Sequence, residues 1–360
     1  MGSMINRRSL MLATSSAAAV GVLRSVPSRA ATRELRVIVG GGDFAKAFIE
    51  AYVKPFEVET GVKVTPIPQN ITDAQLAMMV STKSVSVDVG IVGDVDTLAR
   101  KGYIEKIDYS IYNKDDLEGL IEGCKHPFAI APYIVSLNMV YNTTKFPAGA
   151  PRPATWADFW DLAKFPGSRS LASMPWGCWE EALLADGVPV DKLYPIDIDR
   201  ALASLDKIKA HVRKWWGNGS EILQIMRDGV ADVSQCFDGR AVFLIDQGAP
   251  IEINRNQAKM YWDNLAIPKG SPNFENAQRF VELTSRSDRQ AAFAQIYPQA
   301  PSNRNAYKHL PEKIGRKLCT YPEYKDAGYF RNIKWLSEAA SDGLTNQERL
   351  VQRWNQWILK

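Results

Sequence analysis

The feature that most constrains the fold of this chain is a repeated alternation of short β-branched runs with helical patterns. The first run, 35–39, ends in the turn residues 40–43, and a helical pattern with one apolar face follows. A second strand is expected at 62–67, and a further strand-and-helix unit at 88–101. Strands that alternate with helices predict an α/β fold, with a parallel sheet covered by helices on both faces.

Segment 130–142 is a long apolar run, typical of a buried strand, and a proline-rich stretch, 147–153, follows it. We interpret this passage as the crossing from one domain to a second. About 330 residues remain after an N-terminal leader, which exceeds one ordinary core and favours two domains. Further on, the patterns predict helices at 156–163, after the cap Thr155, and at 201–214, strands at 231–237 and 261–267, and a mainly helical segment from 312.

Residues 1–30 have the pattern of an export signal that is cleaved. Arg7 and Arg8 precede an apolar run, 10–23, and a small-residue cleavage site follows. The string 6–11 resembles a twin-arginine signal, and the general secretory route is the alternative. The apolar run is shorter than the roughly 20 residues that span a bilayer. The sequence therefore predicts an exported, periplasmic protein.

The leader also carries the excess positive charge of the chain. The net charge is +4, and the four charged residues of the leader are all positive: Arg7, Arg8, Arg24 and Arg29. Removing these four from +4 leaves a net charge of zero. A nucleic-acid binder needs a basic surface, so nucleic acid is not expected as a partner.

Residues that carry reactive or metal chemistry are few. No histidine lies in a zinc or hydrolase motif, and the cysteines form no C-x-x-C pair. We therefore predict neither a metal ion nor another cofactor. One or two disulfides and buried free thiols both stay open for the four widely spaced cysteines. These residues are His126, His211 and His309, and Cys124, Cys178, Cys236 and Cys319.

Five strings along the chain, taken in order, carry a family resemblance: 35–44, 56–64, 101–108, 155–161 and 261–268. Together they resemble the spermidine/putrescine-binding proteins of bacterial ABC importers, over nearly the whole chain after the leader. The resemblance implies a non-enzymatic periplasmic binding protein of two α/β lobes, each a sheet flanked by helices, joined by crossing hinge strands. Lobe 1 would comprise 31–135 and 260–310, and lobe 2 would comprise 136–259 and 311–360. The expected partners are a small-molecule ligand and an ABC permease in the inner membrane, and the protein itself is expected to be a monomer.

Members of that family hold amines between aromatic rings and carboxylates, because a π face attracts a cation and an acid pairs with it. Carried over by position, the resemblance places the ligand between loops of both lobes. The implied ligand contacts are Gly42, Asp43, Phe44, Asp94, Trp176, Gly177, Trp179, Phe237, Asp238, Arg240, Tyr261, Asp263 and Tyr297.

Two departures from the family pattern change the expected ligand. The acidic pair of the second lobe is replaced by the string 174–179, so Glu180 or Glu181 would need a shift to supply it. Arg240 follows in a cleft segment, and a guanidinium suits a carboxylate far better than an amine. We therefore expect either a polyamine-like solute or an amino-acid conjugate or opine, with Asp238 or Asp263 on its amine and Arg240 on its carboxylate.

Each of these residues also has a plainer interpretation. The glycines at 40–42 are compatible with a simple turn, since no phosphate-binding motif is complete, and Asp43 with a helix cap. Trp176 and Trp179 would serve equally as core residues, and Arg240 would serve in an ion pair with Asp238 or Glu252. Trp215 and Trp216, like Trp335, Trp354 and Trp357, are assigned to packing. A ferric-ion binder, for which Tyr297 and Tyr307 form no adjacent pair, and a secreted enzyme using Cys178 are the alternative functions.

Overall fold

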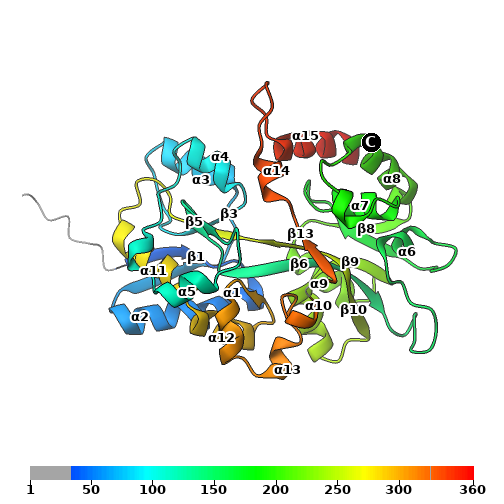
Figure 1. Ribbon diagram of the computed structural model, residues 1–360, viewed down its shortest axis with the longest axis horizontal. Coiled ribbons are helices and arrows are strands. Elements are labelled where there is room, and N and C mark those ends of the chain that lie inside the picture. The colour runs from blue at the N-terminus through cyan, green and yellow to red at the C-terminus, as the bar shows by residue number, and fades with distance from the viewer. Residues whose placement is uncertain (1–33, 325) are drawn as a thin grey trace, which may run out of the picture. The chain divides into compact units, whose positions relative to one another are not determined.

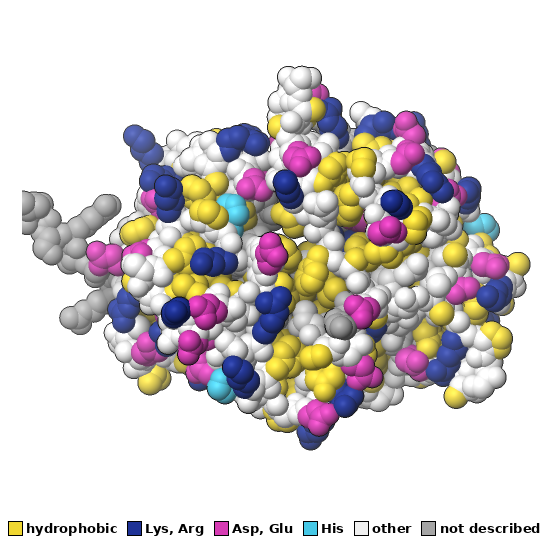
Figure 2. Space-filling view, in the orientation of Figure 1, with side chains coloured by type: hydrophobic (Ala, Val, Ile, Leu, Met, Phe, Trp, Pro, Cys, Tyr) yellow, Lys and Arg dark blue, Asp and Glu magenta, His cyan; other side chains and the backbone are white. Residues whose placement is uncertain are grey.

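The computed structural model describes residues 34–324 and 326–360 (Figure 1). The predicted leader, 1–30, and its cleavage site lie outside the described residues. Within the described part of the chain, no helix is both long enough and apolar enough to cross a lipid bilayer. Basic and acidic side chains are interspersed over the face drawn in Figure 2, in keeping with the balanced charge of the chain after its leader.

The chain begins with the strand and helix units that its pattern predicts. β1 and β2 run parallel, with Leu35 opposite Val64, and the helical stretch between them buries its apolar face. Gly61 ends that stretch at φ 67°, a left-handed conformation that glycine adopts without strain. The elements are β1 (Glu34–Ile38), α1 (Gly42–Phe48), a π-helical turn (Ile49–Val53), α2 (Lys54–Thr60), β2 (Lys63–Ile67), α3 (Asp73–Ser81), β3 (Gly90–Val92) and α4 (Val95–Arg100).

A four-stranded sheet, ordered β3-β11-β5-β4, continues this part, and a parallel bridge from Val37 to Val89 joins it to β1. The predicted parallel pairing is present in β1 and β2, whereas β11 returns from late in the sequence and runs antiparallel to both neighbours. The elements are a 3₁₀ turn (Tyr109–Ile111), α5 (Lys114–Gly119), β4 (Lys125–His126), β5 (Ala129–Ile130) and β11 (Asn264–Ala266).

A seven-stranded mixed sheet, ordered β13-β10-β6-β9-β7-β8 with β12 beside β6, forms the other side of the molecule (Figure 1). Its strands and the helices around them are β6 (Tyr133–Asn142), α6 (Trp156–Trp160), β7 (Arg169–Ala172), α7 (Trp179–Ala185), a 3₁₀ turn (Val190–Lys192), α8 (Ile198–Lys209), β8 (Val212–Trp216), α9 (Gly219–Arg227), β9 (Val233–Phe237), α10 (Asp238–Asp246), β10 (Ile251–Trp262), β12 (Ala300–Pro301) and β13 (Gly328–Phe330).

The remaining elements follow β11 along the chain. They are α11 (Phe274–Ser285), α12 (Ser287–Ile296), a 3₁₀ helix (Arg304–His309), α13 (Glu312–Gly315), a 3₁₀ turn (Pro322–Tyr324), α14 (Ile333–Ser337) and α15 (Asn346–Ile358). The segment from 312 is therefore largely helical, as predicted, but it also contains β13, which pairs with β10. In Figure 1, β13 leads upward into α14, which lies between the two sides of the molecule.

Two long antiparallel strands, β6 and β10, connect the two sheets. Trp262 at the end of β10 lies opposite Ile134 near the start of β6, with β11 and β5 adjacent at the same end. Nearly all of β6 is buried, as its apolar composition predicts. The register of the pair shifts between Asn254 and Lys259, and this irregularity redirects the side chains of β10 beyond it. The crossing strands implied by the family resemblance are thus present.

Other local predictions have mixed outcomes. Thr155 caps α6, where its hydroxyl accepts a hydrogen bond from the Asp158 backbone N–H at 3.2 Å. The helix predicted over 201–214 ends early, because α8 stops at Lys209 and the residues after it pair as β8 with β7. The cysteines are all buried free thiols.

The tryptophans assigned to packing do pack. Trp216 and Trp354 are fully buried, and Trp357 is nearly so. Trp215 meets the rings of Trp354 and Trp357 edge-on, and Trp335 meets Tyr194.

Candidate ligand-binding site

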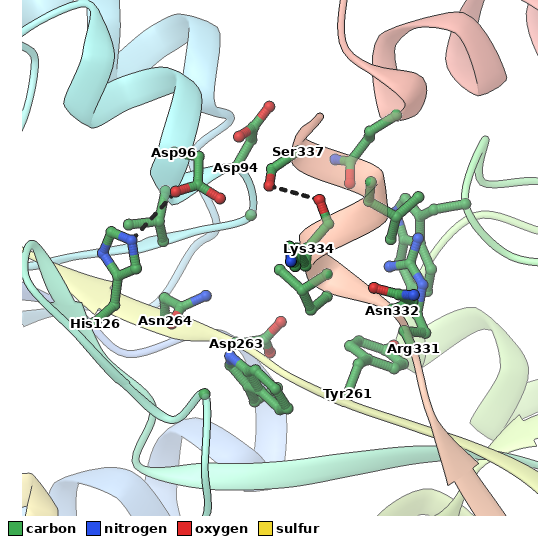
Figure 3. Close-up of a pocket in the computed structure, with 18 of the residues that line it drawn as sticks. Asp94, Asp96, His126, Tyr261, Asp263, Asn264, Arg331, Asn332, Lys334 and Ser337 are labelled. Atoms are coloured by element: carbon green, nitrogen blue, oxygen red, sulfur yellow. Dashed lines mark hydrogen bonds and ion pairs between the residues drawn. The ribbon is translucent and has the colours of Figure 1, made fainter. Parts of the chain in front are cut away.

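A cavity of about 590 Å³ lies at the ends of the crossing strands (Figure 3). Its wall comes from the β10–β11 junction, the start of α4, the segment around β4, and the passage from β13 into α14. A ligand inside therefore meets charges of both signs and aromatic rings. The charged and aromatic lining residues are Asp94, Asp96, Glu122, Lys125, His126, Trp176, Tyr261, Trp262, Asp263, Arg331 and Lys334.

Asp263 occupies the single position between β10 and β11, where the strand pattern breaks. Its carboxylate is partly exposed to the cavity, and its Oδ2 accepts a hydrogen bond from the Tyr133 hydroxyl at 3.1 Å. Burial raises the pKa of the Asp263 carboxyl above its usual value, and the hydrogen bond from Tyr133 offsets part of that rise. A carboxylate in this position gains from a cationic partner.

Aromatic rings stand beside Asp263. Trp176 and Tyr261 meet edge-to-face, with their ring centroids 5.3 Å apart. Both line the cavity, so Trp176 is not the core residue of the alternative interpretation. Trp262, the last residue of β10, lines the cavity as well.

Behind this wall lies a buried ionic cluster. The Lys259 ammonium is fully buried, 3.0 Å from Glu180 Oε2 and 2.8 Å from Glu181 Oε2. Burial alone would raise the pKa of Glu180, but the charges of Lys259 and Arg331 hold it below its usual range. For Glu181 burial prevails, and its pKa is raised. Both acids are committed to Lys259, so neither replaces the acidic pair of the polyamine binders.

Arg331 links this cluster to the cavity, and the sequence reasoning missed it. It follows β13, and its backbone N–H donates to Met260 O of β10 at 2.9 Å. Its side chain is 8% exposed, with Nε 3.5 Å from Glu180 Oε1 and the guanidinium over the Tyr261 ring. No sequence motif marks a lone arginine after a three-residue strand. Arg331 also lies far beyond the last of the five family strings, which ends at residue 268, so the family resemblance does not point to it.

Acidic residues at the start of α4 face the cavity from the other side (Figure 3). Asp94, a predicted contact, caps α4 by accepting the Thr97 backbone N–H at 3.0 Å. Asp96, two residues on, is paired with His126 at 3.2 Å. His126 Nδ1 accepts the Phe128 backbone N–H, so the ring donates to Asp96 from Nε2. Sequence reasoning found Asp94 but not Asp96 or His126.

A second group of predicted residues gathers around Tyr297. The Arg240 guanidinium lies 5.6 Å from the Tyr297 ring centre, and Phe44 meets the same ring at 5.7 Å. Phe44 also meets Tyr133 at 5.4 Å, and Tyr133 bonds Asp263. A continuous aromatic wall therefore joins Arg240 to Asp263.

The side chain of Arg240 forms no hydrogen bond or ion pair with any residue that the structure describes. The structural ion pair considered as an alternative is absent among these residues, because Glu252 pairs with Arg152 and Asp238 accepts the Ser136 backbone N–H. Asp43, whose charge also reaches Tyr297, pairs with Lys46 at 2.8 Å and does not cap α1.

The remaining predicted residues lie outside the cavity lining, as do Asp43, Phe44, Arg240 and Tyr297. Trp179 is core, packed against Trp354. Gly177 is buried, with its carbonyl bound by Lys259, and a side chain there would meet Ala172. Phe237 packs on Trp216, Asp238 is buried at the start of α10, and Gly42 opens α1. As ligand contacts, these residues stay predictions.

Known proteins similar to this chain agree on one class. The profile of the family described as bacterial extracellular solute-binding protein matches residues 51–317. A gamma-aminobutyric acid-binding protein of Pseudomonas aeruginosa is 29% identical over 351 residues, which cover 94% of this chain and 95% of that protein.

Solved structures show the same likeness. The crystal structure of an ABC transporter protein from Rhodopseudomonas palustris superposes with a TM-score of 0.81 at 31% identity, over 90% of this chain and 98% of that one. A periplasmic binding protein from Agrobacterium tumefaciens R10, in complex with agropinic acid, superposes with a TM-score of 0.78 at 29% identity, over 91% and 99%. The first is an ABC transporter protein and the second is a periplasmic binding protein. The chain therefore belongs to the bacterial extracellular solute-binding proteins and is the solute-binding protein of an ABC transporter.

Proposed function

We propose that this protein is exported to the periplasm, where as a monomer it captures a small solute that carries both an amine and a carboxylate, and passes it to an ABC permease of the inner membrane. The observation that carries the proposal is the pair of opposite charges at the two ends of one aromatic wall. Asp263 stands at one end, partly exposed to the cavity. The guanidinium of Arg240, which has no hydrogen-bond or ion-pair partner among the described residues, stands at the other.

Asp263 is the proposed partner of the amine. Its raised pKa reflects a carboxylate that burial disfavours, and a ligand ammonium would relieve that cost by pairing with it. The rings of Trp176 and Tyr261 supply π faces that attract the same cation. A charge-assisted hydrogen bond and an aromatic neighbour together favour an ammonium over a neutral group.

Arg240 is the proposed partner of the carboxylate. Its fork of N–H donors matches a carboxylate in two parallel bonds, and no described side chain occupies that fork. Tyr297 beneath the guanidinium holds it in place by a cation–π contact. The residue is only half-buried, so a ligand arriving from solvent can reach it.

We propose that the ligand closes the two lobes about the crossing strands. With lobe 1 at 31–135 and 260–310 and lobe 2 at 136–259 and 311–360, the first two boundaries fall within β6 and β10, and the third falls between the 3₁₀ helix at 304–309 and α13. Asp263 then belongs to lobe 1 and Arg240 to lobe 2. A ligand that touches both lobes favours the closed state by its extra contacts there. Two of the three relatives support this ligand class, since one is named for an amino acid and another is bound to agropinic acid.

The test is calorimetric titration of the purified protein with 4-aminobutanoate, putrescine and larger amino acid conjugates. We expect compounds with both charges to bind and putrescine to bind weakly or not at all. Asp263→Asn and Arg240→Gln should each weaken binding about 10- to 100-fold, because each removes one charged hydrogen-bond partner. Retained affinity in Arg240→Gln would assign Arg240 to a structural role.

Matched surface variants control for charge alone. Asp191→Asn and Arg213→Gln remove the same charges at exposed positions away from the cavity, and binding should be unchanged. Turnover of any compound in the panel would favour an enzyme, and a coloured complex with ferric ion would favour a metal binder.

A further inference from the structure

The Arg331 side chain makes no hydrogen bond to any residue that the structure describes. Its Nε is buried without a hydrogen-bond partner, and the whole side chain is 8% exposed. The guanidinium carries five N–H donors, and buried donors are nearly always satisfied. Arg331 lines the cavity, where Figure 3 shows it beside Tyr261 and Asn332. Unlike Nε, its terminal nitrogens are not sealed off from solvent, so these are the donors that a group in the cavity can reach.

The neighbours of Arg331 balance its charge without filling its donors. Glu180 Oε1 lies 3.5 Å from Nε, but Glu180 already accepts hydrogen bonds from the Tyr194 hydroxyl and from Lys259. Tyr261 offers only a ring face, 5.9 Å from the guanidinium carbon. The charge is thus tolerated inside the protein while the planar donor fork stays open, and that fork suits a carboxylate.

Positive and negative side chains lie on opposite sides of the cavity. Lys334 also lines the cavity from α14, is exposed, and has no ion-pair partner among the described residues. Asp94 and Asp96 face these two cations from α4 (Figure 3). An acidic group in the cavity is therefore drawn to the β13–α14 side and repelled from the α4 side.

The proposed function already places one carboxylate at Arg240, which lies over Tyr297 and outside the residues that line this cavity. A cavity of about 590 Å³ falls in the range of about 300–1,000 Å³ that holds ligands larger than a simple amino acid. We infer that the ligand is an amino compound with two acidic groups, one held by Arg240 and the second by Arg331. This inference rests on the proposed function, and it makes Arg331 a specificity-determining residue.

The test compares 4-aminobutanoate with N-(carboxymethyl)-4-aminobutanoate, which carries the second acid on a methylene attached to its amine. Calorimetric titration of the full chain should show about 10-fold or greater preference for the second probe. Hydrogen bonds between its second acid and the charged guanidinium should raise the affinity by at least that factor. Arg331→Gln should reduce the preference to about twofold or less. Because each preference is a ratio within one variant, a general loss of affinity cancels.

Glu180→Gln is the matched control, since it removes the ion pair but leaves the guanidinium. It should keep the wild-type preference, and circular dichroism confirms that both variants fold. An unchanged preference in Arg331→Gln, or an equal loss in Glu180→Gln, would overturn the role of Arg331. Equal affinity of the wild-type protein for both probes would contradict the inference that the ligand carries a second acidic group, but not the proposed function. Binding of neither probe would contradict the proposed function and this inference together.

Discussion

Among single residues, Asp263 has the environment that most determines the chemistry of the site. It sits where β10 gives way to β11, beside the buried rings of Tyr133 and Tyr261. Burial raises its pKa, and only one hydrogen bond, from Tyr133, stabilises its charged form. The carboxylate is therefore incompletely compensated in the free protein, which is the state that a cationic ligand can exploit.

The raised pKa of Asp263 predicts a pH dependence of ligand binding. A ligand ammonium pairs with the ionised carboxylate, so affinity should be full above the raised pKa and fall as the pH drops through it, by up to about tenfold per pH unit. The fall should begin above the ordinary aspartate value of about 3.9. Calorimetric titrations between about pH 4.5 and 7 measure it. The slope should vanish in Asp263→Asn, and a slope that persists there belongs to another group.

Lys259 carries a stability prediction. Its removal in Lys259→Met leaves Glu180 and Glu181 buried without their main partner, which should lower the free energy of unfolding by about 3–5 kcal/mol. Urea unfolding at neutral pH measures this. Lys214→Met is the control, because its pair with Glu221 is solvent-exposed and is worth at most about 1 kcal/mol. A loss for Lys259→Met as small as that of the control would contradict the buried cluster.

At the scale of elements, β13 positions the cavity wall. This three-residue strand is held by its parallel pairing with β10, and Arg331 and α14 follow it directly. Gly328 makes the pairing close, since a Cβ there would lie 2.6 Å from the Ala258 carbonyl oxygen. The pairing of this short strand with β10 thus depends on Gly328 having no side chain.

Gly328→Ala should therefore push β13 away from β10. Overpacking of this kind costs about 1–3 kcal/mol, and the shift of Arg331 should weaken ligand binding as well. Thermal unfolding and titration measure the two effects. Gly41→Ala is the control, because nothing lies within 4 Å of its added Cβ. Unchanged stability and affinity in Gly328→Ala would show that β13 tolerates the displacement.

The elements that the sequence predicted are those with a strong local pattern. β1, α1 to α2, β2 and β6 follow from periodicity and turn residues, and the Thr155 cap from its spacing to Asp158. β13 and β8 could not be predicted in this way, because each is specified by pairing with a distant strand. The candidate site divides similarly. Asp94, Trp176, Tyr261 and Asp263 were found by family position and line the cavity, whereas Arg331 depends on β13 and was missed.

At the scale of the whole molecule, the crossing strands β6 and β10 place one cavity between two sheets. The residues that line this cavity are far apart in the sequence, from Asp94 in the first third of the chain to Lys334 near its end. The described part of the chain also holds a second cavity, of about 490 Å³, lined by Arg152, Glu252 and Arg255 among others. We assign the ligand to the first of these two cavities, because there aromatic rings flank a partly buried carboxylate.

A crystal structure of the protein with the amino acid that it binds most tightly is the most direct test of this assignment. We expect the ligand amine to lie within about 3.2 Å of an Asp263 carboxylate oxygen, with a ligand carboxylate on the Arg240 guanidinium and the rings of Trp176 and Tyr261 against the ligand. A ligand bound in the cavity beside Arg152, or one that leaves Asp263 without a contact, would contradict it.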